Sequence, residues 1–207
     1  MKRVAVLIAV LLCAMPAFAQ TAEEIISRME EVMGNHEKDG IVMTIDIKIP
    51  ILGTTSSRSY ILGDKMRVEV TMMGETAVNW TDGVTDWTYD SKKNEIEIEN
   101  ATPEDGSSND NEAEMFKGIT EGYDVSIKKE TADAWHILCK KSKTNKEKDD
   151  PDKMDLVVAK ETYYPVSLSA KISGVRVTLR DISYGVTEKQ VTFNPADYPD
   201  AKIIDKR

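Results

Sequence analysis

The fold of this chain is best predicted from the segment Ile41-Val-Met-Thr-Ile-Asp-Ile-Lys-Ile-Pro-Ile51. Every odd position in it is apolar, whereas the even positions 44, 46 and 48 are Thr, Asp and Lys. A period of two is typical of a β-strand with one face buried and the other in water. Alternation of this kind continues along the chain and predicts about eleven strands joined as consecutive hairpins. The further strands are expected at residues 57–62, 65–73, 76–81, 85–90, 95–99, 123–129, 135–141, 154–161, 165–173 and 175–184.

Helical periodicity is confined to two stretches. In residues 22–36, Ile25, Met29 and Val32 recur at helical spacing on one face, and residues 114–121 are expected to form a short central helix. Long helices do not alternate with the strands, which argues against a parallel α/β fold. We therefore expect a mainly β (α+β) fold, in which an N-terminal helix and a short central helix cover the concave apolar face of a curved antiparallel sheet.

The first nineteen residues differ in kind from the rest. Lys2 and Arg3 precede an apolar run, and Ala17-Phe18-Ala19 offers the small residues that a signal peptidase reads. The apolar run is shorter than the roughly 20 residues of a membrane span. We expect residues 1–19 to be a cleaved signal peptide, residues 20–207 to form a single domain, and the protein to reside in the periplasm.

Composition narrows the possible functions. The chain has 207 residues, of which 41% are apolar, and its formal net charge is −9. The apolar share is sufficient for a packed core, and the acidic balance argues against nucleic acid as a partner. Beyond the signal segment only Cys139 remains, so no internal disulfide is expected.

No reactive constellation is recognisable in the sequence. His36 and His136 are the only histidines, and no cysteine pair or HExxH motif accompanies them. The acidic stretch 103–114 lacks the spacing of a calcium loop, and neither a Gly-x-Ser-x-Gly elbow nor a glycine-rich phosphate loop occurs. We expect no enzymatic activity, no catalytic residues, no metal site and no cofactor.

The apolar side of the sheet is the remaining candidate for function. The chain contains ten methionines, and flexible thioether side chains suit a surface that accommodates varied apolar shapes. An ordinary core filled with methionine explains the composition equally well at this point.

A specific resemblance lies in residues 60–99. The hairpin Asp82-Gly-Val-Thr-Asp-Trp-Thr-Tyr-Asp90, followed by Ile96 and Ile98, resembles the central segment of the LolA/LolB family of periplasmic lipoprotein carriers. Residues 164–168 and the closing Phe193-Asn-Pro195 resemble the last strands of that family. The resemblance spans most of residues 22–204.

The resemblance implies an unclosed β half-barrel of about eleven strands, with helices as a lid over an apolar cavity. It also implies a monomeric carrier (chaperone) that takes lipoprotein acyl chains, or another lipid, from an inner-membrane release complex to an outer-membrane acceptor. Arg67 is the candidate for the arginine that holds the family's lid. The expected lipid-binding residues are Met43, Ile45, Ile47, Met66, Val68, Val70, Trp80, Trp87 and Ile98. The expected lid residues are Met29, Val32, Met33, Met115 and Phe116.

Two alternatives share the expected fold. One is a periplasmic binding module that senses lipids or a protein partner, and the other is a packed structural domain without a ligand. A filled concave face would favour the structural domain.

Overall fold

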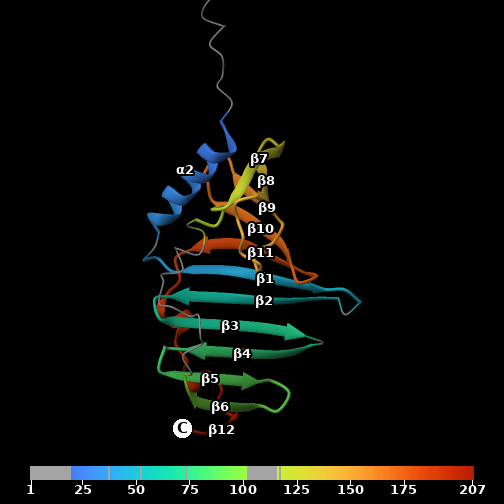
Figure 1. The fold of residues 1–207 in the computed structure, drawn as a ribbon. Coiled ribbons are helices and arrows are strands. Elements are labelled where there is room, and N and C mark those ends of the chain that lie inside the picture. Colours follow the sequence, from blue (N-terminus) through green and yellow to red (C-terminus); the bar gives the residue numbers. More distant parts are fainter. Residues whose placement is uncertain (1–19, 37, 52, 73, 102–115, 117) are drawn as a thin grey trace, which may run out of the picture.

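The fold consists of one large, unclosed β-sheet with a helix on one side and the C-terminal segment on the other (Figure 1). The computed structural model describes residues 20–36, 38–51, 53–72, 74–101, 116 and 118–207. The twelve strands follow the order β12-β6-β5-β4-β3-β2-β1-β11-β10-β9-β8-β7, and the terminal strands β12 and β7 do not pair with each other. The expected signal peptide, residues 1–19, lies outside the described residues.

The elements follow the expected order closely. The strands are β1 Ile41–Ile49, β2 Gly53–Leu62, β3 Lys65–Met72, β4 Glu75–Thr81, β5 Thr85–Asp90, β6 Glu95–Asn100, β7 Tyr123–Glu130, β8 Ala134–Lys141, β9 Lys153–Ala159, β10 Pro165–Ile172, β11 Val175–Tyr184 and β12 Lys202–Asp205. The helices are α2 Ala22–Gly34, α3 Glu188–Val191 and the 3₁₀ helix η2 Pro195–Asp197. The mainly β class and the unclosed sheet are confirmed.

The C-terminal segment differs from the expectation. The last expected strand ends at residue 184, but beyond it Glu188–Val191 is helical, and η2 follows. The chain then adds a twelfth strand, β12, which pairs with β6 in parallel. Of the expected central helix, residue 116 forms a 3₁₀ turn and residues 118–121 form turns, whereas 114, 115 and 117 lie outside the described residues.

Helix α2 begins at a capping box. The Glu24 backbone N–H donates to Thr21 Oγ1 at 3.2 Å, and the Thr21 N–H donates to Glu24 Oε2 at 3.0 Å. These bonds satisfy amide groups that would otherwise lack partners at the first turn. Ile25, Met29 and Met33 form the buried face of the helix. None of the helices in the described part of the chain is long and apolar enough to cross a membrane.

Gly40 sets the path from α2 into β1. Its φ is +67°, and a Cβ at this position would lie 2.6 Å from the carbonyl oxygen of Ile61 and 2.9 Å from Cβ of Val186. A larger residue would therefore collide with the backbone of β2. The next residue, Ile41, is the first of β1 and is buried in one cluster with side chains of α2.

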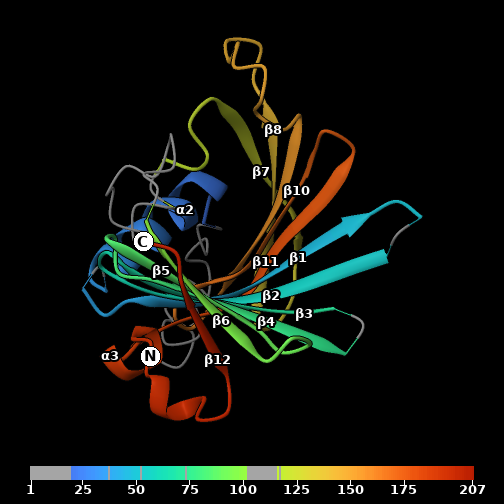
Figure 2. The same ribbon diagram turned by 90° about the horizontal axis from the view of Figure 1, so that it is seen from below.

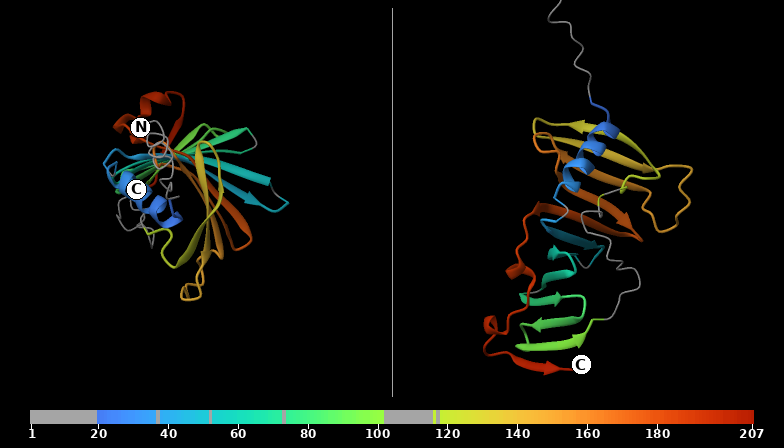
Figure 3. Two further views of the ribbon diagram at one scale, coloured as in Figure 1. Left: turned by 90° about the horizontal axis from the view of Figure 1, so that it is seen from above. Right: turned by 90° about the vertical axis from the view of Figure 1, so that its left-hand side faces the viewer.

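The register of the strands defines two faces of the sheet. In β1, Ile41 and Met43 pack with α2 in one cluster of buried side chains, whereas Val42 packs with Val186 and Val191 of the C-terminal segment in another. We call the first side the helix face and the second the opposite face. Figure 3 shows that α2 lies over the half of the sheet formed by β7 to β11, while β3 to β6 extend beyond the helix.

The apolar side of the sheet changes between β3 and β4. Two residues separate these strands, so Met72 pairs with Glu75 and Arg67 pairs with Trp80. Directly opposed residues on antiparallel strands point to the same face. The apolar residues of β3 therefore lie on the helix face, whereas those of β4 to β6 lie on the opposite face.

Candidate functional site

Six of the nine expected lipid-binding residues lie together on the helix face. Across β2, Met43 pairs with Ser59, which in turn pairs with Val68. Ile45 and Val70 are linked in the same way through Ser57. Ile47 follows on β1 and Met66 on β3. Aliphatic rows on β1 and β3 thus flank the shorter serine side chains of β2.

The exposure of this face increases away from the helix. Met43 is fully buried beneath α2, and Ile45 is partly buried against the same cluster. Farther along, Ile47 is 38% exposed, and on β3 Met66 is 37% exposed. The apolar surface is therefore continuous from the core into a region that α2 does not cover.

The expected lid residues contribute to the covered part. Met29, Met33 and Phe116 are buried in one cluster with Met43, and Val32 is half-buried. Met115 lies outside the described residues. The structure thus brings together helix α2 and the first residues of β1 in one buried cluster.

Trp80, Trp87 and Ile98 do not join this surface. The register pairs Trp80 with Trp87 and Trp87 with Ile98, so all three lie on the opposite face. The ring of Phe193 lies 5.4 Å from Trp80 and 5.5 Å from Trp87, measured between centroids. The C-terminal segment therefore packs against the two tryptophans, and the expected single lining is divided between the two faces.

Arg67 also lies on the opposite face. Its guanidinium carbon lies 5.5 Å from the ring centre of Tyr60 and 5.6 Å from that of Trp80, and the side chain forms an ion pair with Glu69. None of these partners belongs to α2. The described contacts of Arg67 consequently tie β2, β3 and β4 together rather than fastening the helix.

Part of the helix face was not anticipated from the sequence. Ile45 pairs with Leu179 and Ile47 pairs with Val177 on β11, and both partners are half-buried. These residues extend the apolar surface to the other side of β1. The alternation of Val175, Val177 and Leu179 is visible in the sequence, but the pairing of β1 with β11 spans more than 120 residues and has no local signal.

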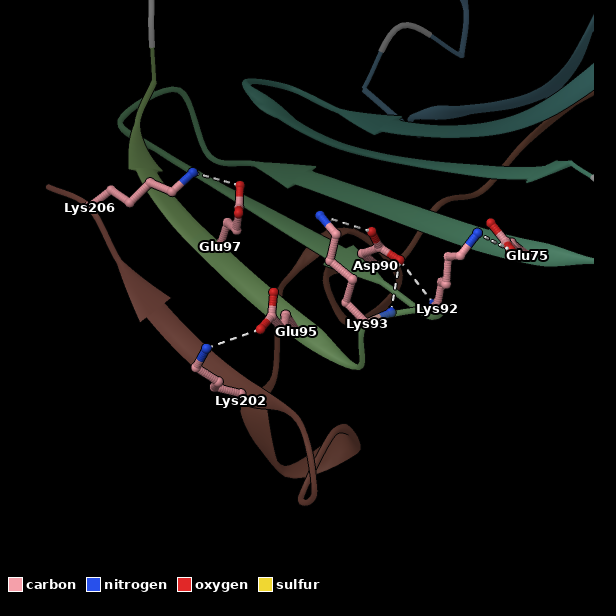
Figure 4. Close-up of polar contacts among 8 residues, drawn as sticks. All are labelled: Glu75, Asp90, Lys92, Lys93, Glu95, Glu97, Lys202 and Lys206. Carbon is pink, nitrogen blue, oxygen red and sulfur yellow. Dashed lines mark hydrogen bonds and ion pairs between the residues drawn. The ribbon is translucent and has the colours of Figure 1, made fainter.

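The helix face becomes acidic beyond β3. Four lysines from the turn after β5 and from the C-terminal strand and tail accompany the carboxylates (Figure 4). The Glu95 carboxylate lies 3.0 Å from Lys202 Nζ, and Glu97 lies 2.7 Å from Lys206 Nζ. The apolar surface is thus bounded on this side by a row of hydrated, paired charges.

The buried thiol of Cys139 sits within the core beneath α2. Burial is the main cause that raises the pKa of this thiol to about 11. The group is therefore a protonated thiol at neutral pH, and a protonated thiol is a poor nucleophile. In the described part of the chain, no group of three or more His, Cys, Asp or Glu side chains is placed to hold a metal ion.

No protein-family model and no curated protein matches the chain. Among solved structures, LprF from Mycobacterium bovis has a TM-score of 0.50 at 8% identity, with 86% of this chain and 99% of that chain covered. An uncharacterized conserved protein from Thermus thermophilus has a TM-score of 0.46 at 17% identity, with 89% and 99% covered. The LolA superfamily protein NE2245 from Nitrosomonas europaea has a TM-score of 0.33 at 11% identity, with 86% and 100% covered.

At these identities the likeness is one of fold alone. Solved structures similar to the chain include a LolA superfamily protein and a putative outer membrane lipoprotein-sorting protein domain from Vibrio parahaemolyticus. The overall fold of the chain is thus shared with LprF, almost the whole of which the likeness covers.

Proposed function

We propose that the protein is an exported carrier that shelters the acyl chains of a lipoprotein, or of another lipid, on the helix face of its sheet. One observation carries the proposal. The apolar surface formed by β1, β3 and β11 is continuous with the core under α2, yet Ile47 and Met66 on it remain more than one third exposed. A linear aliphatic chain lying along this surface would remove these side chains from water.

The chemistry of the surface suits acyl chains. The six residues of the proposed lining are aliphatic or methionine, and burial of each methylene contributes about 0.8 kcal/mol. Met43 and Met66 have flexible side chains that can adjust to chains of different length. Trp80, Trp87 and Ile98 are assigned a structural role, because they lie on the opposite face, against which the C-terminal segment packs.

The place of action follows from the same proposal. Residues 1–19 have the basic start, apolar run and small-residue cleavage site of an export signal. The carrier would work in the periplasm as a single domain of residues 20–207, receiving cargo from an inner-membrane complex and delivering it to an outer-membrane acceptor. It would do so without catalysis.

A charge placed on the helix face tests the proposal. Val68→Asp puts a carboxylate between Met66 and Val70, where an acyl chain would lie, whereas Val84→Asp is the matched control at a turn where valine is 73% exposed. Titration with a fluorescent fatty acid and with an acylated peptide measures affinity. We expect Val68→Asp to weaken binding at least about tenfold, because desolvating an unpaired carboxylate is costly, and Val84→Asp to bind as the unchanged protein does.

Native mass spectrometry identifies what the protein carries from the cell. Co-purified lipid or acylated protein supports the carrier. A ligand-free protein that also ignores both probes would favour the packed structural domain. Binding of a protein partner without any acyl chain would favour the sensing module.

A further inference from the structure

Large aliphatic side chains are exposed at three neighbouring hairpin tips. Ile51 lies in the turn between β1 and β2 and is fully exposed. Met72 at the end of β3 is 58% exposed, and Ile172 at the end of β10 is 43% exposed. Exposed apolar side chains are unremarkable when scattered singly, but a group of them indicates an interaction surface.

The topology places these tips at one end of the sheet. β1 and β3 run in the same direction and end at this side, and β10 ends beside the start of β11, which pairs with β1. Figure 1 shows the three hairpins projecting on the right of the sheet, and Figure 2 shows them again as neighbours in the perpendicular view. We call Ile51, Met72 and Ile172, with the described residues beside them, the tip surface.

The backbone presents Ile51 outward. Its φ is +73°, in the left-handed region that β-branched residues rarely adopt. Glycine or asparagine would be the favoured residue in such a turn. Because Ile51 is not buried, packing in the core does not offset the strain of this conformation. This indicates that its side chain contacts another molecule.

The β1–β2 and β10–β11 hairpins also carry a positive charge. Residues 47–55 and 170–177 contain Lys48, Lys171 and Arg176 and no acidic residue, although the whole chain has a net charge of −9. All three cationic side chains are exposed, and no ion pair joins any of them to another described residue. These two hairpins of the tip surface are therefore locally basic on an acidic protein.

Aliphatic side chains flanked by cations are complementary to a membrane surface. The aliphatic groups enter the boundary between head groups and acyl chains, and lysine and arginine attract anionic lipids. The exposed part of the helix face reaches this end of the sheet through Ile47 and Ile49. A membrane bound at the tip surface would thus lie next to the exposed part of the proposed acyl-chain site.

We propose that the tip surface docks the protein on an anionic phospholipid bilayer. Ile51, Met72 and Ile172 enter the interface, and Lys48, Lys171 and Arg176 contact the head groups. Docking is peripheral and reversible, since three side chains and a few charges provide only a small insertion. The docking is separate from cargo binding, because the tip residues lie beyond the six lining residues.

Vesicle co-sedimentation tests the proposal. The protein is mixed with vesicles of phosphatidylglycerol and phosphatidylcholine, or of phosphatidylcholine alone, at low and at high salt. We expect preferential binding to the anionic vesicles that weakens as salt rises. The double variants Ile51→Ser/Ile172→Ser and Lys48→Glu/Lys171→Glu should each lower the bound-to-free ratio at least about fivefold.

Matched controls separate the tip surface from other exposed groups. Val84→Ser removes an aliphatic group that is 73% exposed at the other end of the sheet, and Lys189→Glu reverses an exposed charge on α3. Both controls should bind vesicles as the unchanged protein does. Circular dichroism confirms that each variant folds. The cargo-site variant Val68→Asp should still dock, which keeps a failure of the carrier proposal distinguishable from a failure of this one.

Three results would overturn the assignment. The first is binding of the unchanged protein to anionic vesicles no greater than that of an unrelated acidic protein. The second is undiminished binding by both double variants. The third is a dimer in sedimentation velocity that Ile51→Ser/Ile172→Ser abolishes while vesicle binding is absent, because a second copy would then occupy the tip surface.

Discussion

Arg67 of β3 lies directly opposite Trp80 of β4, with its guanidinium carbon 5.6 Å from the centre of the indole ring. The ring of Tyr60 on β2 lies at 5.5 Å from the same carbon. Both contacts are on the opposite face, at the point where the apolar side of the sheet changes. Arg67 thereby links β3, whose apolar side chains lie on the helix face, to β4, whose apolar side chains lie on the opposite face.

Arg67→Ala should lower the free energy of unfolding by about 1–3 kcal/mol, because two cation–π contacts are lost together. Arg67→Lys keeps the charge but not the flat guanidinium, and it should lose less. Urea unfolding monitored by tryptophan fluorescence gives both values. Acyl-ligand affinity of the folded variants should not change. Weaker ligand binding at unaltered stability would instead place Arg67 in the lid mechanism.

Asp46 should make the junction of β1 and β11 sensitive to acid. Arg180 Nε donates to Asp46 Oδ2 at 2.6 Å, and Ser56 Oγ donates to Oδ1 at 2.5 Å. Hydrogen bonding from Arg180, helped by Ser56, holds the pKa of Asp46 below its ordinary value. The stabilisation is therefore present above the unfolded-state pKa of about 3.9 and is lost as the pH falls through the lower folded-state value.

Urea unfolding of the unchanged protein and of Asp46→Asn across pH 3 to 7 measures this effect. At neutral pH the variant should be less stable by about 1 kcal/mol or less, since the pair is partly exposed. The difference should shrink below about pH 4. Asp124→Asn, at an exposed carboxylate on β7, is the control. A difference that stays constant over the whole range would contradict the linkage.

Cys139 should react with thiol reagents only when the core opens. The side chain is buried beneath α2, and the pKa of its thiol is raised to about 11. We expect maleimide labelling at neutral pH to be at least about a hundredfold slower in the folded protein than in urea. In the folded protein the sulfur atom is inaccessible to the reagent, and only a small fraction of the thiol is ionised. Cys139→Ala should fold normally. Rapid labelling of the native protein would show that the helix leaves the sheet frequently.

Strand β12 should protect β6 from pairing with other molecules mainly through the backbone hydrogen bonds of the β12–β6 pair, and less through its lysine side chains. Lys202→Ala and Lys206→Ala remove the ion pairs to Glu95 and to Glu97 and Glu99 (Figure 4), and each should leave the free energy of unfolding nearly unchanged, because solvent screens these exposed pairs. Deletion of residues 201–207 should instead expose β6 as an edge strand and promote self-association. Sedimentation velocity checks this outcome. A truncated chain that remains monomeric would show that β6 is protected by other means.

The local parts of the fold were predictable because they depend on short-range patterns. The alternation in residues 41–51 identified β1, and residues 175–184 were expected with the observed bounds of β11. The helix at residues 188–191 was missed, although Thr187-Glu-Lys-Gln190 has the spacing of a capping box. Strand β12 has only four residues, too few for a reliable period of two.

The division of the apolar residues between two faces was missed for a different reason. Met66 and Trp80 both occupy even positions in apolar–polar alternation, and each strand by itself gives no indication of which side it buries. The two-residue turn between β3 and β4 fixes the register, and it places these residues on opposite faces. Register across a hairpin was thus available in the sequence, whereas the cover of Trp80 and Trp87 by Phe193 required the folded chain.

The change of side between β3 and β4 has a consequence for how such a protein diversifies. The aromatic cluster around Phe193 shares no side chain with the aliphatic rows of β1 and β3. Selection can therefore alter one set of residues, and with it the molecule that is accepted, while the other set preserves the framework. The sheet thus contains two sets of positions that can change independently. The aliphatic rows set which molecule is accepted, and the aromatic cluster maintains the stability of the fold.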